Sequence, residues 1–341
     1  MADLSTAFGG LRLPNPVIAA SCEYTMTEPG ILACLDAGAG AVVAKSINES
    51  PAAAKQLDIA DYLLLDHDLH AVPWTSAHGT ETLFNRSGLA QTTLEEWVAM
   101  LERCQRHASA TGSAVIGSVT VASAEGAARL AAAMAEVVPA IEVNVGAPHG
   151  REAAAVRQIT EAEGVAHYTR TVRAAVDCPL IVKLPGQAGD IVAMARAAAG
   201  NGADAVCLTG RFNGFVPNLD TWDPELGSWG AIGGPWALPI SLYWISKCFG
   251  TVPALIGTNG ARDGLDVARF LLSGARAVEM ASLLLTNGAP ALADTISQLD
   301  AYLDRHGVTH LDEVIGAAAR RAKGYHEIDP IIPPVRPWLD N

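Results

Sequence analysis

Eight short apolar runs, separated by segments with helical character, constrain the fold of this 341-residue chain more than any other feature. The runs are rich in β-branched residues, and they are continuously apolar rather than alternating. Such runs are typical of parallel strands that are covered on both faces. The predicted strands span 16–21, 41–46, 114–120, 140–145, 180–185, 205–210, 254–258 and 277–282.

Helical segments are predicted between most of these strands. They span 30–37, 94–108, 125–137, 161–175, 191–199, 239–249, 264–272 and 289–304, and a further helix is predicted over 311–322. Three helix-to-strand joints begin with the same Gly-Ala pair, because glycine ends a helix in a left-handed turn and alanine lets the chain enter the sheet at once. Eight strand–helix units predict a closed (β/α)8 barrel, that is, a TIM barrel, with a doubly wound open sheet as the alternative.

The composition favours one large acidic domain. Half of the residues are hydrophobic and 17% are charged, which supports a large core. The chain has 23 Lys and Arg against 36 Asp and Glu, for a net charge of −13. This balance argues against nucleic acid or an anionic membrane as the main partner. We expect a single domain over 1–341, with a Pro-rich tail at 329–341 that is extended and packs on the barrel or on a partner subunit.

Several features favour a reduced, cytoplasmic protein. None of the apolar runs is long enough to span a membrane, and the first residues do not resemble a secretory signal. The six cysteines are scattered, so neither a zinc knuckle nor an iron–sulfur cluster is indicated. His67 and His70 lie close together beside aspartates, but no third ligand is evident, and we predict no metal site.

Three long connections at the carboxyl ends of the strands are candidates for function. In a barrel the active site lies where the strands end and the helices begin. The connections span 47–93, 146–160 and 211–238, and long connections in a compact domain are usually functional or form interfaces. The third contains Trp222, Trp229 and Trp236. Substrate contact, a packed cap and a dimer interface are all open for these tryptophans.

Polar residues at the ends of the apolar strands are candidate ligand contacts. A lysine within an apolar strand is costly unless an anion neutralises it. Lys45 and Lys183 occupy equivalent places in the second and fifth strands, which suggests an anionic ligand at the barrel mouth. The alternative is that such a lysine reaches out to solvent. The last two strands end in Gly-Thr-Asn-Gly and Ala-Ser, as in barrels that bind a phosphate through backbone N–H groups.

Taken in order, these segments resemble the dihydroorotate dehydrogenase family, the FMN-dependent barrels that oxidise or reduce a ring carbon–carbon bond. The matching segments are LRLPNPVIAAS from residue 11, GAGAVVAKS from 38, NRSGL from 85, EVNVGAPHG from 142, IVKLPG from 181, GGP from 233, GTNGARDG from 257 and VEMAS from 278. The resemblance implies FMN as cofactor, a small-molecule substrate and a homodimer. It leaves the electron donor or acceptor open.

The resemblance also implies the residues of the site. The cofactor-binding residues it implies are Ala20, Ser21, Lys45, Ser46, Asn144, Lys183, Thr209, Gly233, Gly234, Asn259, Gly260, Ala281 and Ser282. The substrate-binding residues it implies are Lys45, Asn85, Ser87, Gly88, Leu89, Asn144, His149, Thr209 and Gly210. A Lys183 ammonium beside the flavin would stabilise the negative charge that develops near N1 and O2. Asn85 and Asn144 offer both donors and acceptors to an amide-like substrate edge.

The sequence departs from the family at the catalytic base. The family carries a Cys or Ser base in this segment, whereas here the base position is Ala147, which has no ionisable group. His149 replaces an Asn two residues later, and Thr209-Gly210 replaces an Asn-Ser pair at the end of the sixth strand. The flavin residues are nearly all retained. This pattern favours a substrate other than dihydroorotate.

Four residues are candidates for a catalytic role, namely His149, Lys45, Cys22 and Tyr24. The His149 imidazole titrates near neutrality and lies on the loop that lost the base, although it can also serve only to bind substrate. Cys22 and Tyr24 follow the first strand. Tyr24 can donate a proton, whereas cysteines such as Cys22 are more often small buried hydrophobes.

We therefore predict an FMN-dependent oxidoreductase that acts on a CH–CH or C=C bond of a small polar, cyclic substrate by hydride transfer to or from flavin N5. One alternative is a flavoenzyme that acts on a nitrogen, sulfur or halogen centre. Another is a genuine dihydroorotate or dihydropyrimidine dehydrogenase with a different base. A non-enzymatic flavin-binding protein is the third, and retention of both lysines argues against it.

Overall fold

A closed barrel of eight parallel strands forms the centre of the computed structural model, which describes residues 2–50, 55–77, 79–120, 122–145 and 161–339. The strands follow one another around the barrel in chain order, and the last pairs with the first. They are β3 (Val17–Ala19), β4 (Ala41–Val43), β8 (Ala114–Thr120), β9 (Ala140–Asn144), β10 (Leu180–Lys183), β11 (Ala205–Leu208), β14 (Leu255–Thr258) and β15 (Ala277–Met280). All eight predicted strands and the barrel are confirmed, and the open-sheet alternative is wrong.

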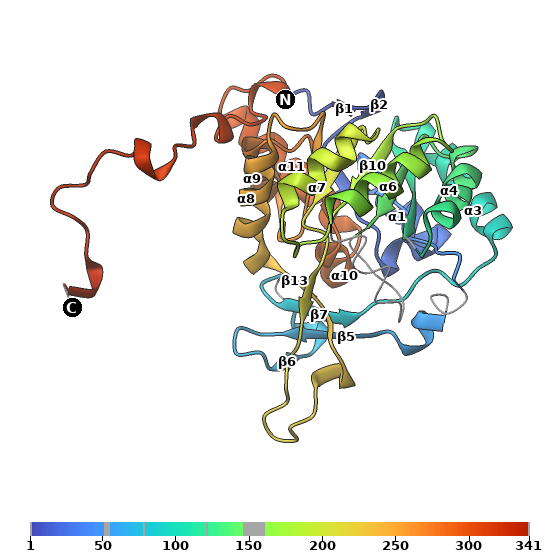
Figure 1. Ribbon diagram of the computed structural model, residues 1–341, viewed down its shortest axis with the longest axis horizontal. Helices are drawn as coiled ribbons and strands as arrows, with labels where there is room; N and C mark the ends of the chain where they lie inside the picture. Colours follow the sequence, from blue (N-terminus) through green and yellow to red (C-terminus); the bar gives the residue numbers. More distant parts are fainter. Residues whose placement is uncertain (1, 51–54, 78, 121, 146–160, 340–341) are drawn as a thin grey trace.

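Helices surround the barrel (Figure 1). They are α1 (Glu28–Asp36), α3 (Leu94–Ser109), α4 (Ala124–Ala135), α6 (Ala162–Arg173), α7 (Ile191–Gly200), α8 (Leu238–Cys248), α9 (Gly264–Ser273), α10 (Ser282–Asn287) and α11 (Pro290–Arg305). The short helix α10 follows β15 directly and was not predicted. Among the described helices, none combines the length and the apolar character needed to cross a membrane.

The helix predicted over 311–322 is wrong. The chain forms two short 3-10 turns there, Leu311–Glu313 and Ala319–Arg321. Gly316 lies between them with a φ of 72°, and its N–H donates to the Leu271 carbonyl of α9 instead of continuing a helix. The sequence pattern is helical, but packing against α9 overrides it.

The barrel interior changes from apolar to polar toward the carboxyl ends of its strands. A hairpin of β1 (Thr6–Phe8) and β2 (Leu11–Leu13) closes the amino end and packs with interior residues such as Ile181. Successive strand residues point to opposite faces, so the next interior position on β10 is Lys183. The same alternation places Glu142 inside on β9. The charged residues of the interior therefore gather at the end where an active site is expected.

A five-stranded antiparallel sheet lies across the carboxyl end of the barrel (Figure 1). Its strands, in spatial order, are β12 (Phe212–Gly214), β13 (Gly230–Gly233), β7 (Thr82–Arg86), β5 (Asp61–Leu65) and β6 (Ala71–Val72). They come from two of the connections predicted to be long and functional, although the strands themselves were not predicted. Asn85 in the central strand pairs with Tyr62 on one side and with Ala231 on the other.

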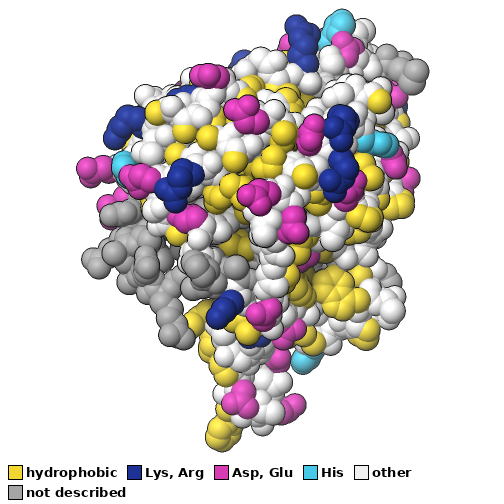
Figure 2. Space-filling model, turned by 90° about the vertical axis from the view of Figure 1, so that its right-hand side faces the viewer, with side chains coloured by type: hydrophobic (Ala, Val, Ile, Leu, Met, Phe, Trp, Pro, Cys, Tyr) yellow, Lys and Arg dark blue, Asp and Glu magenta, His cyan; other side chains and the backbone are white. Residues whose placement is uncertain are grey.

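The Trp-rich connection and the C-terminal tail reach away from the barrel. Between β12 and β13 the chain forms a projection that carries hydrophobic side chains at its end (Figure 2). Leu219 and Trp222 of this connection are 82% and 87% exposed. The tail is exposed from 329 to 338 and extends away from the body of the protein (Figure 1). The prediction that it packs on its own barrel is therefore wrong, and packing on a partner stays a prediction.

Candidate active site

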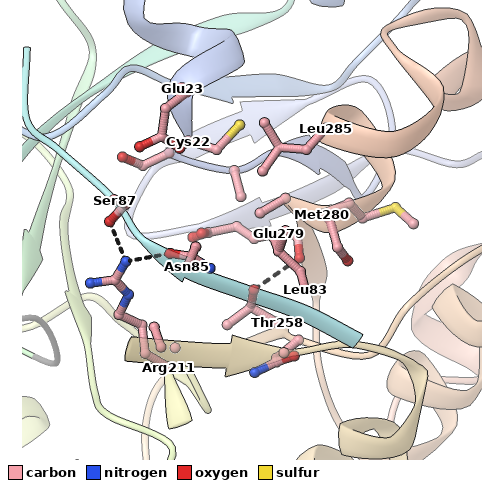
Figure 3. A pocket seen from close by; sticks show the side chains of 18 of the residues that line it. Cys22, Glu23, Leu83, Asn85, Ser87, Arg211, Thr258, Glu279, Met280 and Leu285 are labelled. Atoms are coloured by element: carbon pink, nitrogen blue, oxygen red, sulfur yellow. Dashed lines mark hydrogen bonds between the residues drawn. The ribbon is translucent and has the colours of Figure 1, made fainter. Parts of the chain in front are cut away.

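A large cavity lies between the carboxyl ends of the barrel strands and the antiparallel sheet (Figure 3). It encloses about 1000 Å³ of space, part of which is open to solvent. Lys45 and Lys183 both line it, as predicted from their places on the strands. From the sheet, Tyr62, Asn85 and Ala231 line it together, because they form one row across three paired strands.

Lys183 is held by two buried carboxylates. Its ammonium forms an ion pair with Glu279 of β15 and lies 3.5 Å from Glu142 Oε2 of β9. Burial disfavours a charged lysine, but the Glu142 and Glu279 carboxylates outweigh it and raise the pKa of Lys183. The cavity wall therefore carries a permanent ammonium at this point, which suits negative charge on a bound ring.

Lys45 is also paired. Its Nζ lies 2.7 Å from Glu23 Oε1, and Lys45 is almost completely buried. Burial lowers the pKa of Lys45, and the Glu23 carboxylate opposes that shift. Burial alone would raise the pKa of Glu23, but the nearby Lys45 ammonium reverses the effect and lowers it. As an ion pair, the two groups together add no net charge to the cavity.

Arg211 is the cavity cation that lacks a carboxylate partner in the described part of the chain. Its Nη2 donates to Asn85 Oδ1 at 3.4 Å and to the Ser87 hydroxyl (Figure 3). Burial lowers the pKa of Arg211 from its ordinary value, against the pull of the Glu23 carboxylate, but an arginine stays protonated. A guanidinium presents a planar set of donors that matches a carboxylate or a phosphate.

The structure does not support the predicted roles of Thr209. Its side chain is buried and its hydroxyl lies 2.8 Å from both the Ser241 hydroxyl and the Thr258 carbonyl, away from the cavity. Thr209 has a φ of 68°, which is rare for a β-branched residue, and these contacts hold it there. The chain is thereby turned so that Gly210 and Arg211 line the cavity in its place.

A tight turn after β14 and the start of helix α10 after β15 line the cavity. Asn259 and Gly260 have φ values of 67° and 105°, and a Cβ on Gly260 would lie 2.4 Å from the backbone nitrogen of Leu238. Across from them, Ala281 precedes α10 and provides no side-chain cap, so the first N–H groups of that helix are available to a ligand. Backbone N–H groups in such turns bind phosphate. Both segments are the ones predicted to bind phosphate and both line the cavity, and their role as a phosphate site stays a prediction.

Most of the other predicted residues also line the cavity. They are Ala20, Ser21, Cys22, Ser46, Leu89, Asn144, Gly233 and Ser282. Gly88 and Gly234 lie next to lining residues without lining the cavity themselves. Tyr24 is directed elsewhere, since its hydroxyl accepts a hydrogen bond from the Ala289 N–H at 3.4 Å.

Two further catalytic candidates are His149 and Cys22. His149 lies outside the described residues, as does Ala147 at the position of the missing base. Cys22 lines the cavity, but burial raises the pKa of its thiol to about 11, which keeps it protonated at neutral pH and makes it a poor base.

Sequence reasoning missed several cavity residues. Arg211 stands in a connection whose path is set by tertiary structure, and Tyr62 reaches the cavity only through the antiparallel sheet. For Glu142 and Glu279 a signal was present, because each lies two positions along its strand from an apolar interior residue.

Comparisons with known proteins agree with this geometry. The model of the dihydroorotate dehydrogenase family matches residues 71–303. The chain is 30% identical to the catalytic subunit of dihydroorotate dehydrogenase B (NAD(+)) from Desulforudis audaxviator, over 93% of this chain and 97% of the relative. It is 26% identical to the protein of the same name from Thermoplasma acidophilum, over 94% of this chain and 100% of the relative. It is 30% identical to the protein of the same name from Methanocella arvoryzae, over 92% of this chain and 97% of the relative.

Proposed function

This chain belongs to the dihydroorotate dehydrogenase family of oxidoreductases, and from that premise we propose that it uses FMN to oxidise or reduce a carbon–carbon bond of a small, anionic ring compound. One observation carries the proposal: among the described residues, Arg211 has no carboxylate within ion-pair distance, whereas both lysines of the cavity are paired. We further propose one FMN-binding domain over 1–341 that acts as a cytoplasmic homodimer.

The donors on the cavity wall fit FMN. The turn at Asn259 and Gly260, together with the uncapped start of α10 at Ser282, offers backbone N–H groups for its phosphate. Lys183 offers an ammonium for the polar edge of the ring, and Ser21 lines the opposite side of the cavity. When bound, FMN supplies a hydride acceptor or donor at N5.

The remaining part of the cavity suits a substrate that combines a carboxylate-like group with amide-like edges. Arg211 would bind the anionic group, and its contacts with Asn85 and Ser87 fix the plane of the guanidinium. Asn144 at the end of β9 would contact the polar ring edge. Lys45 would contribute hydrogen bonds rather than net charge, because Glu23 neutralises it.

Proton transfer must differ from that of relatives that use a Cys or Ser base. Ala147 cannot accept a proton, so we propose His149, two residues further along, as the acid–base group. Tyr62 is a second candidate because it lines the cavity, and burial and the Glu23 carboxylate both raise the pKa of its hydroxyl. A tyrosine that stays protonated favours donation of a proton to substrate over its removal.

A second protein is the proposed route for electrons. The relatives are named catalytic subunits of an NAD(+)-linked enzyme, and we propose the same division of labour here. All six cysteines are free and separated along the chain. The isolated chain, once reduced, should therefore not be reoxidised rapidly by NAD⁺.

Purification and anaerobic mixing test the proposal. The protein should be yellow with bound FMN, and dihydroorotate should bleach it slowly or not at all. A panel of unsaturated ring carboxylates and their amides should contain acids that reoxidise the dithionite-reduced protein faster than the matching amides. Rapid bleaching by dihydroorotate would overturn the substrate assignment, and a colourless protein that takes up no FMN would overturn the cofactor as well.

A further inference from the structure

Two glutamates inside the barrel each have a carboxylate oxygen that makes no hydrogen bond in the described part of the chain. Glu142 and Glu279 are 0% and 1% exposed. Glu142 Oε2 and Glu279 Oε1 make no hydrogen bond within the described part of the chain. A carboxylate oxygen of each, together with the Cys207 sulfur, falls within a group of atoms no more than 4.8 Å apart. Two buried carboxyl groups this close are expected to share a proton, because that proton makes one carboxyl group a donor to the other.

The charges around this pair support a proton on it. Lys183 is the ammonium beside it, and Cys207 from β11 is neutral because burial, then Glu279, raises the pKa of its thiol well above the ordinary value. Thr258 from β14 directs its hydroxyl to the Glu279 carbonyl and adds no charge. With both carboxylates ionised, the buried group would carry a net negative charge, which is costly. Burial and the Glu279 carboxylate accordingly raise the pKa of Glu142 to about 8.

A chain of hydroxyl groups connects the pair to the cavity. Ser118 donates to Glu142 Oε1 at 3.1 Å, and its Oγ lies 2.8 Å from Ser46 Oγ. Ser46 Oγ lies 3.2 Å from Ser21 Oγ, and Ser21 lines the cavity. Each hydroxyl can donate and accept at once, so the three serines offer a continuous path for a proton.

We propose that Glu142 and Glu279 form a proton-binding site that holds one shared proton and takes up a second when negative charge appears in the cavity beside Lys183. This inference rests on the proposed function, since reduction of FMN is the event that brings the charge. The substrate transfers a hydride to FMN and gives its second C–H proton to the acid–base group, which releases it to solvent. The additional proton at the glutamate pair comes from solvent through the serines. It forms an O–H bond on the remaining carboxylate, which frees the Lys183 ammonium to balance the charge on the ring. Oxidation reverses each step.

Infrared difference spectroscopy on the FMN-free protein tests the shared proton directly. Between pH 6 and 7, the wild type should show the carbonyl band of a buried protonated carboxyl group. Glu279→Gln should lose it, because the remaining Glu142 would then pair with Lys183 as a carboxylate. Glu125→Gln is the matched control, since Glu125 is exposed on α4, and it should keep the band. Ser118→Ala should keep the band but slow its exchange with deuterated solvent. Absence of the band in the wild type would overturn the proposal.

The reduction potential of bound FMN tests the second proton. If one additional proton is taken up per two electrons, the equilibrium constant for reduction falls a further tenfold for each unit that the pH rises. The reduction potential of the bound FMN then falls by about 30 mV more per pH unit. The wild type and Glu125→Gln should show this steeper dependence near neutral pH, and Glu279→Gln should lose it. Equal slopes in all three would refute redox-linked uptake. The infrared measurement needs no flavin, so a protein that binds no FMN would contradict the proposed function while the band still decides whether the proton is shared.

Discussion

Replacing Arg211 with Gln should weaken the binding of anionic ligands much more than that of neutral ones. In the structure the guanidinium donates to Asn85 and Ser87 and keeps its charge for a ligand. Gln retains an N–H donor but removes the charge. A hydrogen bond to a charged group contributes about 1.5–3 kcal/mol. Since about 1.4 kcal/mol corresponds to a tenfold change in affinity, we expect a loss of about 10- to 100-fold.

Orotate and uracil form a matched pair of probes, because they share a ring and differ by one carboxylate. Binding can be followed through changes in the absorbance of bound FMN. The wild type should prefer orotate, and Arg211→Gln should abolish most of that preference while changing uracil affinity less than about threefold. Arg211→Lys should lie in between, because it keeps the charge but loses the planar pair of donors. Equal orotate affinity in wild type and Arg211→Gln would refute the assignment, as would an equal loss for uracil.

Three further predictions concern stability, the phosphate site and the tail. Folding raises the pKa of Glu142 from 4.5 to about 8, so between these pH values Glu142 binds more protons in the folded chain than in the unfolded one. Its stabilising contribution is therefore complete below pH 4.5 and is lost as the pH rises toward 8. Urea denaturation should therefore show a free energy of unfolding that falls with pH by up to about 1.4 kcal/mol per unit in this window, less steeply in Glu279→Gln. Gly260→Ala should weaken FMN binding at least about tenfold, because the added Cβ would collide with α8. Gly10→Ala is the matched control, since Gly10 also has a positive φ but faces open space, and it should leave FMN binding unchanged. Deleting 329–341 should change neither FMN content nor melting temperature, because the described part of this tail is exposed.

The barrel could be predicted because its signal is local. Each strand is a short apolar run between helices, and the alternation of side chains places Lys183 inside without knowledge of its neighbours. The antiparallel sheet has no such signal, since Asn85 pairs with Ala231 from a distant connection. The helix expected over 311–322 failed for the same reason, because a contact between Gly316 and α9 decides the local structure.

The site was predictable where a strand sets the direction of a side chain and not where a backbone turn does. Thr209 directly follows β11, where the resemblance implied a ligand contact, but with its positive φ its side chain turns inward and Arg211 lines the cavity. A sequence pattern does not reveal that φ, because β-branched residues rarely adopt it. The assignment of substrate contacts at this strand end therefore moved along the chain, from Thr209-Gly210 to Gly210-Arg211.

The balance of charges explains why this displacement matters for function. Two conspicuous lysines in apolar strands suggest an anionic ligand, yet the structure neutralises Lys45 with Glu23 and surrounds Lys183 with two carboxyl groups. A substrate anion therefore meets Arg211 as its main unpaired charge among the described residues. Lys183 can balance negative charge in the cavity only as far as its carboxyl partners accept protons. In the proposed function, substrate charge and cofactor charge are met by separate groups, so substitutions at Arg211 and at Glu279 should alter ligand selectivity and the pH dependence of the potential independently.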